Sequence, residues 1–264
     1  MVLPAVKAGF WQGAYIRTCS CPKTIHDVGD QMSFNGKFQA KLHRGKAVCV
    51  ELDTDSESLP LAHLNMSEYD IHAITHSLGK RWRESTATAT MRFNERIINV
   101  TYDLVCAYKL NLAFYERLGW NGMRALERTI EYIRCVDPTI PVICDAHRGE
   151  DADSNTYYAE YAFDILNADA IVVSQRIDKR VLDTLSKYAC NEKTIIVRRN
   201  LQRGGDLRGA VLFGLNYPKG HNLIFGSSRD VIHASSNANF ETVARTAVVG
   251  MQAQIDSAVQ DVLV

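Results

Sequence analysis

From residue 104 onward, short apolar runs alternate with longer segments of helical period, and this alternation is the strongest constraint on the fold. Strands are expected at residues 104–110, 140–146, 170–174, 194–197 and 223–225. Helices are expected at residues 122–136, 155–166, 178–189, 206–215 and 240–264. Because these strands are apolar throughout, we expect a parallel sheet with helices on both faces, an α/β fold.

The earlier part of the chain adds two helices and a strand to this pattern. Residues 34–43 and 93–102 are helical in pattern, and residues 47–53 form an apolar run that ends in Asp53. We count about six strands between residues 47 and 225, whereas a complete (β/α) barrel has eight. The expected fold is therefore a divergent TIM-type (β/α) barrel with fewer than eight regular βα units.

The chain is expected to form a single large domain with an extension. No linker rich in proline or glycine divides it, so we expect an N-terminal extension over residues 1–33 and one barrel domain over residues 34–264. Within the extension, residues 14–19 have the pattern of a short strand, which we expect to help close or cap the sheet. Residues 54–90 are polar and mixed, and no element is expected there.

Charge and cysteine content narrow the class of protein. The 30 basic side chains balance 30 acidic ones, so no bulk electrostatic attraction to nucleic acid or to an anionic membrane is expected. No apolar run approaches the ~20 residues that span a bilayer, and the first residues lack the apolar core of a secretory signal. The seven cysteines form no C-x-x-C pair, so we expect reduced thiols in a cytoplasmic protein.

Polar side chains gather where the expected strands end, which in a (β/α) barrel is the face that carries catalytic groups. The segment Asp145-Ala-His147-Arg-Gly-Glu150-Asp151 follows one strand, and Lys109 closes another. Like charges grouped around a cation are a means of shifting pKa values. The alternative for the acidic segment is a charged surface loop that precedes a helix cap. The alternative for Lys109 is a side chain that extends into solvent at the rim of the barrel.

Two further segments have the composition of a phosphate site. Residues 225–229 (FGSSR) end in Ser228 and Arg229, and Arg203-Gly204-Gly205 stands at another expected helix start. Backbone amides at a helix start and a forked guanidinium both bind phosphate. Each motif is weak on its own, and the alternative is that these arginines face solvent.

Taken in order, segments across residues 34–260 resemble the orotidine 5′-monophosphate decarboxylase family. Residues 103–119 (DLVCAYKLNLAFYERLG) are similar to the family's second-strand motif, which carries a catalytic lysine. Residues 142–156 resemble the segment after the third strand, which in the family reads approximately D-A-K-R-G-D-I-G-N-T. The other similar segments are residues 49–53 (the first-strand motif, whose aspartate touches the ribose), residues 204–206 (the end of the phosphate loop) and residues 227–229 (where an arginine holds the phosphate).

The resemblance implies a lyase that uses no cofactor, an alternating Lys-Asp-Lys-Asp array, and a homodimer whose partner subunit supplies the last aspartate. Lys109 and Asp145 match the first two members. His147 stands where the family has its proton-donating lysine, and Glu150 or Asp151 stands where it has the final aspartate. The residues expected to bind the substrate, a pyrimidine ribonucleotide 5′-phosphate, are Asp53, Asn111, Thr156, Arg203, Gly204, Gly205, Ser228 and Arg229.

Several positions depart from the family motif, so the site is interpreted as repurposed. A histidine titrates near ~6.5 and gives or takes a proton, but it does not supply the fixed charge of a lysine. The phosphate loop lacks its Pro-Gly start, has Arg198 and Arg199 there, and has Arg203 in place of glutamine. Leu110 and Thr54 replace prolines. We therefore expect decarboxylation or another acid/base step on a similar nucleotide.

Two other interpretations stay open. One is a non-catalytic pseudoenzyme that binds a nucleotide or serves as a scaffold. The other is a metal-dependent lyase or hydrolase in which Asp145, His147 and Glu150 bind a divalent ion, because oxygen and nitrogen ligands together suit such metals. The favoured interpretation needs neither metal nor cofactor, and its partners are a small nucleotide and a second copy of the chain.

Overall fold

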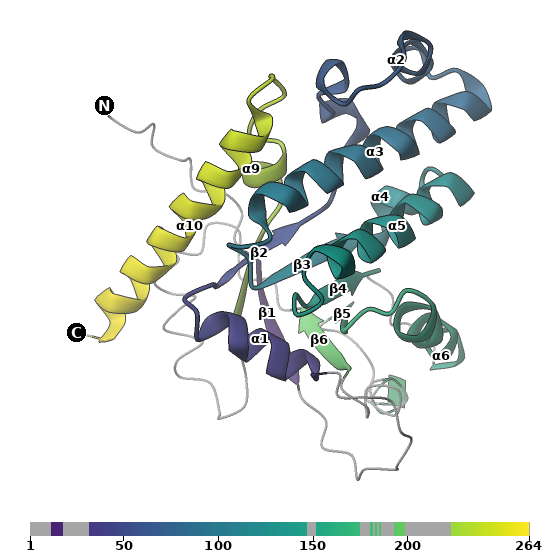
Figure 1. Ribbon diagram of the computed structural model, residues 1–264. Coiled ribbons are helices and arrows are strands. Elements are labelled where there is room, and N and C mark those ends of the chain that lie inside the picture. The colour runs from purple at the N-terminus through teal and green to yellow at the C-terminus, as the bar shows by residue number, and fades with distance from the viewer. Residues whose placement is uncertain are drawn as a thin grey trace, which may run out of the picture.

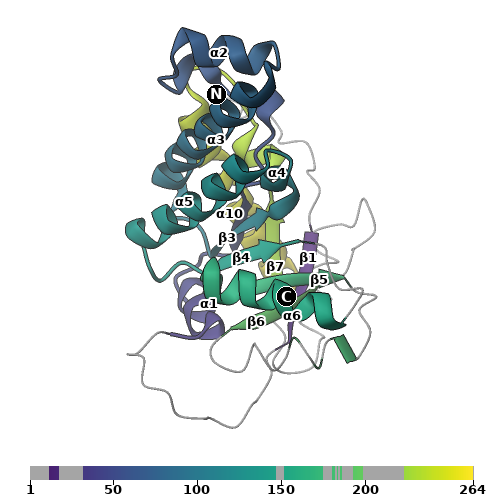
Figure 2. The same ribbon diagram turned by 90° about the vertical axis from the view of Figure 1, so that its right-hand side faces the viewer.

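The computed structural model describes residues 12–17, 32–146, 152–174, 180, 181, 183, 185, 193–198 and 223–263. Within these residues, the strands form a closed barrel in the order β1-β6-β5-β4-β3-β2-β7 (Figures 1 and 2). The strands are β1 (Gln12–Arg17), β2 (Val48–Glu51), β3 (Ala107–Asn111), β4 (Val142–Asp145), β5 (Ala170–Ser174), β6 (Thr194–Arg198) and β7 (Leu223–Ser227).

The strands β2 to β7 are parallel to one another and confirm the expected TIM-type fold with fewer than eight units. The strand β1 is antiparallel to both β6 and β7, and its Ala14 pairs with Arg198 on one side and Ile224 on the other. The expectation that residues 14–19 close the sheet is confirmed for residues 14–17, and the strand begins two residues earlier. It satisfies backbone groups on β6 and β7 that would otherwise form open edges.

The long helices follow one another around the outside of the sheet, in the order α10, α3, α5, α6 (Figure 1). Their bounds are α10 (Phe240–Leu263), α3 (Gly79–Thr101), α5 (Trp120–Val136) and α6 (Ala152–Glu160), which continues as a π-helix, Tyr161–Ile165. Among the described helices, none combines the length and the hydropathy needed to cross a bilayer. Shorter elements are α1 (Phe34–Leu42), α2 (Glu68–Thr75), α4 (Leu112–Glu116), α9 (Arg229–Ile232) and the 3₁₀ turns Ser56–Ser58 and Leu61–His63.

The helix α2 and the first part of α3 lie in the region where no element was expected. The cause is visible at residues 85–90, where Ser85, Thr86 and Thr90 are buried on α3, which packs against α5. Small polar residues therefore occupy positions that are usually apolar, so the hydrophobic period that marks a helix is weak there. Of the other expected helices, residues 206–215 lie outside the described residues, whereas Arg180, Val181, Asp183 and Leu185 are helical within 178–189.

The barrel interior is packed at its amino end by apolar side chains. Alternate residues of the strands point inward, among them Cys49, Ala107, Ile143 and Ile196, and Phe34 and Phe38 of α1 pack against them. The intervening residues, such as Val50 and Tyr108, belong to the outer core beneath the helices. Because side chains alternate along a strand, the same inward face continues toward the carboxyl ends, where polar residues replace the apolar ones.

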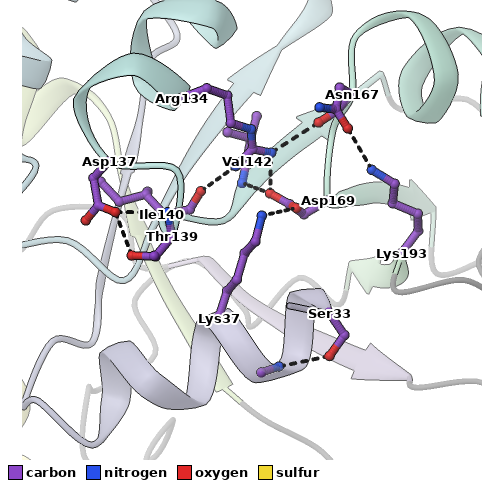
Figure 3. Close-up of polar contacts among 11 residues, drawn as sticks. Ser33, Lys37, Arg134, Asp137, Thr139, Ile140, Val142, Asn167, Asp169 and Lys193 are labelled. Atoms are coloured by element: carbon purple, nitrogen blue, oxygen red, sulfur yellow. Dashed lines mark hydrogen bonds and ion pairs between the residues drawn. The ribbon is translucent and has the colours of Figure 1, made fainter. Parts of the chain in front are cut away.

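Ion pairs hold α1 against the amino end of the barrel (Figure 3). The carboxylate of Asp169, which precedes β5, contacts Lys37 Nζ at 2.8 Å and Arg134 Nη2 at 2.5 Å, and it accepts the backbone N–H of Val142 at 2.8 Å. On the next turn of α1, Lys41 Nζ lies 2.8 Å from Asp137 Oδ2. These contacts join α1 to α5, β4 and β5 and close the amino end.

Candidate active site

Three ionisable side chains converge inside the barrel near the carboxyl ends of β2, β3 and β4. Lys109 Nζ lies 3.1 Å from Glu51 Oε1 and 3.2 Å from Asp145 Oδ2. Glu51 is 5%, Lys109 7% and Asp145 1% exposed. Glu51 and Lys109 are direct partners in the pairing of β2 with β3, so strand register places this lysine between two carboxylates.

Asp53 adds a third carboxylate to this cluster. It lies two residues beyond Glu51, accepts a hydrogen bond from the backbone N–H of Asn111, and its Oδ1 has no hydrogen-bond partner among the described residues. Burial raises the pKa of Asp53 to about 6. Lys109 opposes that rise, whereas the charges of Glu51 and Asp145 reinforce it. A buried oxygen without a partner is costly, so Asp53 is suited to receive a hydrogen bond from a ligand.

Lys109 keeps its proton in this environment. Burial acts to lower the pKa of Lys109, but the three surrounding carboxylates outweigh burial and raise it above its ordinary value. A permanent positive charge that is largely removed from water stabilises developing negative charge strongly, because it needs no reorganisation during the reaction. The cluster can therefore supply a fixed electrostatic field at the mouth of the barrel.

Replacing Asp53 by Asn is expected to stabilise the protein at pH 8 by up to about 3 kcal/mol. The native state holds the Asp53 proton up to its pKa of about 6, whereas the ordinary pKa of an aspartate carboxyl is 3.8. The wild type therefore loses stability as the pH rises from about 4 to about 6 and above, because the buried Asp53 must then give up its proton, whereas an asparagine stays uncharged. Urea denaturation of wild type, Asp53→Asn and the exposed control Asp164→Asn at pH 8 and pH 5 measures the effect. The gain in the free energy of unfolding should fall to about half at pH 5. An equal gain at both pH values would contradict the expected titration of Asp53.

A buried hydrogen-bond network holds the backbone next to these carboxylates. Thr54 Oγ1 donates to Asn94 Oδ1 at 2.6 Å, and Asn94 Nδ2 donates to the Tyr115 hydroxyl at 3.0 Å and to Thr129 Oγ1 at 3.2 Å. The Tyr115 hydroxyl in turn donates to the carbonyl of Leu52 at 3.1 Å. The hydroxyl of Thr54, at a position where the family motif has proline, thus joins the segment after β2 to α3, α4 and α5.

The expected phosphate residues at the end of β7 lie at the start of α9. Arg229 is exposed, whereas Ser228 is half-buried and its Oγ has no hydrogen-bond partner among the described residues. A buried hydroxyl without a partner and a neighbouring guanidinium are both available to an anion. Asn111 caps α4, where its Oδ1 accepts the N–H of Ala113 at 3.1 Å, and Thr156 lies half-buried on α6.

The other expected site residues lie outside the described residues. They are His147, Glu150, Asp151, Arg203, Gly204 and Gly205. Within the part of the chain that the structure describes, no three His, Cys, Asp or Glu side chains are arranged to hold a metal ion. The metal-binding alternative depends on His147 and Glu150, so it stays an untested prediction.

Glu51 is the residue of this cluster that sequence reasoning missed. A signal was present, because Glu51 is an acid inside an apolar run (AVCVELD) and lies two positions before Asp53. In a strand, that spacing places both side chains on the same face. Its contact with Lys109 could not be read from the sequence, since the contact depends on the register between two strands.

The parallel strands β2 to β7, with a buried lysine and several carboxylates at their carboxyl ends, place the chain in the class of TIM-type (β/α) barrels. No protein-family model matches the chain. Orotidine 5′-phosphate decarboxylase from Herpetosiphon aurantiacus is 34% identical over 180 residues, which are 68% of this chain and 59% of that protein. The enzyme of the same name from Parabacteroides distasonis is 27% identical over 278 residues, covering 81% of this chain and 91% of that protein.

Solved structures show the same fold. An OMP decarboxylase from Leishmania donovani superimposes with a TM-score of 0.61 at 22% identity, over 86% of this chain and 98% of that one. Orotidine 5′-monophosphate decarboxylase from Plasmodium berghei gives a TM-score of 0.63 at 14% identity, over 88% of this chain and 100% of that one. The chain is thus similar to proteins named orotidine 5′-phosphate decarboxylase over most of its length, and it spans about three fifths of the Herpetosiphon aurantiacus enzyme.

Proposed function

We propose that this protein binds a pyrimidine ribonucleotide 5′-phosphate and carries out cofactor-free acid/base chemistry on it, either decarboxylation or a related step. The observation that carries the proposal is the buried Lys109, held at 3.2 Å from Asp145 at the mouth of the barrel. The similarity to proteins named orotidine 5′-phosphate decarboxylase supports the same reaction class.

The roles of the residues follow from their charges. In a decarboxylation, the bond between the ring and its carboxylate breaks, carbon dioxide leaves, and the electron pair remains on the ring carbon until a proton replaces the carboxylate. Asp145 would repel the substrate carboxylate, and Lys109 would stabilise the charge that develops on carbon. His147 would deliver the proton, because imidazolium is a proton donor near neutral pH.

The remaining proposed contacts bind the rest of the nucleotide. Asp53 would accept a hydrogen bond from the ribose, for which its unpartnered Oδ1 is available. Asn111 and Thr156 would lie near the base, and Glu150 or Asp151 would complete the charged array. The proposed phosphate ligands are Arg203, Gly204, Gly205, Ser228 and Arg229.

We further propose a homodimer with shared active sites, one barrel domain over residues 34–264, and a cytoplasmic location. The family resemblance supports the dimer, because the last acid of the array comes from a partner subunit there. The continuous sheet supports the single domain, to which the segment before residue 34 adds β1. The free thiols of Cys49, Cys106, Cys135 and Cys144 are compatible with a reducing compartment.

Calorimetry with uridine 5′-monophosphate and the ultraviolet absorbance of added orotidine 5′-monophosphate test this function. We expect uridine 5′-monophosphate to bind at least about tenfold more tightly than uridine, because charge-assisted hydrogen bonds hold its phosphate. Arg229→Ala should lower the affinity for uridine 5′-monophosphate about tenfold. Arg128→Ala, which removes an arginine from an exposed ion pair on α5, should leave that affinity unchanged.

The combination of outcomes separates the alternatives. Loss of orotate absorbance with wild type supports decarboxylation. Binding of the nucleotide without any turnover would favour the pseudoenzyme. Failure to bind uridine 5′-monophosphate would contradict the proposed function altogether.

A further inference from the structure

Glu51 is a buried ionisable residue of the candidate site to which the family resemblance assigns no role. Its side chain belongs to β2, is almost fully buried, and places Oε1 3.1 Å from Lys109 Nζ. Burying a carboxylate is unfavourable unless it is paired. The contact with Lys109 provides that pairing, and it also makes Glu51 a competitor for the charge on the lysine.

The neighbouring strand leaves space for this carboxylate. On β7, Gly226 faces Glu51 so closely that a Cβ built on the glycine would collide with Glu51 Oε1. The strand β7 lies on the opposite side of β2 from β3. The carboxylate is therefore held in the barrel interior between β7 and the ammonium of Lys109.

Among the described residues, the charges in this part of the site are unequal in number. Lys109 contacts the carboxylates of Glu51 and Asp145 directly and is also influenced by Asp53. One ammonium therefore balances at most one of these three carboxylates. A ligand that brings another carboxylate to Lys109 would meet Glu51 as an additional like charge, and the ammonium would already be engaged.

We propose that Glu51 is a specificity-determining residue, whose carboxylate disfavours a pyrimidine nucleotide with a carboxylate on its ring relative to one with an uncharged ring. This inference rests on the proposed function and deepens it, because it names the class of nucleotide that the site prefers. Removing the charge of Glu51 should free Lys109 for an anionic ring substituent and remove one source of repulsion.

Dissociation constants for uridine 5′-monophosphate and orotidine 5′-monophosphate, measured with wild type and Glu51→Gln, test the inference. We expect Glu51→Gln to raise the affinity for orotidine 5′-monophosphate by about tenfold or more relative to uridine 5′-monophosphate, since a like charge in a partly desolvated site is removed. If a protein turns over orotidine 5′-monophosphate, its kcat/KM for that nucleotide is compared in place of the dissociation constant. Glu131→Gln is the matched control, because it removes the same charge at an exposed site on α5.

Two further variants guard against a purely structural effect. Glu51→Asp keeps the charge and should retain most of the wild-type preference, whereas Glu51→Ala should behave like Glu51→Gln and replaces it if that variant does not fold. Equal changes for both nucleotides, or a relative loss for orotidine 5′-monophosphate, would overturn the inference and leave the proposed function intact. A wild-type protein that binds neither nucleotide would overturn both.

Discussion

Lys109→Met is expected to abolish turnover of the nucleotide, with a loss of about 10³-fold or more in kcat. Removal of a preorganised charge or donor that stabilises a transition state commonly costs 10²–10³-fold, and here the loss also leaves Asp53, Glu51 and Asp145 without their shared cation. Methionine keeps most of the side-chain volume, so packing is preserved. Steady-state kinetics with orotidine 5′-monophosphate measure the effect.

The same substitution should destabilise the protein by about 3–5 kcal/mol at neutral pH, because it removes one partner from a buried set of charges. Without Lys109, which opposes the rise in the pKa of Asp53, Asp53 takes up a proton more readily in the native state, so the loss should grow as the pH rises. Lys80→Met, at an exposed position on α3, is the matched control. Full activity in a folded Lys109→Met variant would refute the role of this lysine.

Asp169→Asn is expected to lower the free energy of unfolding by about 3–5 kcal/mol. The carboxylate is 7% exposed and pairs with two cations, Lys37 and Arg134, whose side chains are 11% and 18% exposed. It also accepts the buried N–H of Val142. An amide cannot balance the two charges, so both cations lose their buried counter-charge and the attachment of α1 weakens.

Urea denaturation followed by circular dichroism measures this loss. The exposed Asp164→Asn, on the π-helix that follows α6, is the matched control and should change stability by less than about 0.5 kcal/mol. The ligand contacts lie at the opposite end of the barrel, so nucleotide affinity of the folded variant should stay near that of wild type. A loss below about 1 kcal/mol would show that the ion pairs of Asp169 contribute little to the attachment of α1.

Much of the fold could be predicted because strand and helix signals are local. The expected strand at residues 170–174 coincides with β5, and the helix expected at 122–136 coincides with most of α5. The region around α2 and α3 could not be predicted, since Thr86 and Thr90 are buried there without an apolar period. Tertiary packing decides such cases, because a small polar side chain fits between helices as well as an apolar one.

The candidate site was predictable where a residue's own strand carried the information. Lys109 and Asp145 end apolar runs, and they meet at 3.2 Å because β3 and β4 are adjacent and parallel. Glu51 was missed because its importance depends on Lys109 on a neighbouring strand and on the space above Gly226. A single sequence carries no direct record of such register.

By itself, the sequence determined the α/β class and the positions of most elements, since these follow from periodicity along a short stretch of chain. Only the tertiary structure decided that Gln12–Arg17 closes the barrel as an antiparallel strand. It alone also decided that Asp169 holds α1 and that Glu51 shares Lys109 with Asp145. These contacts join residues far apart in the chain, and their energies arise only when burial and strand register bring the charges together.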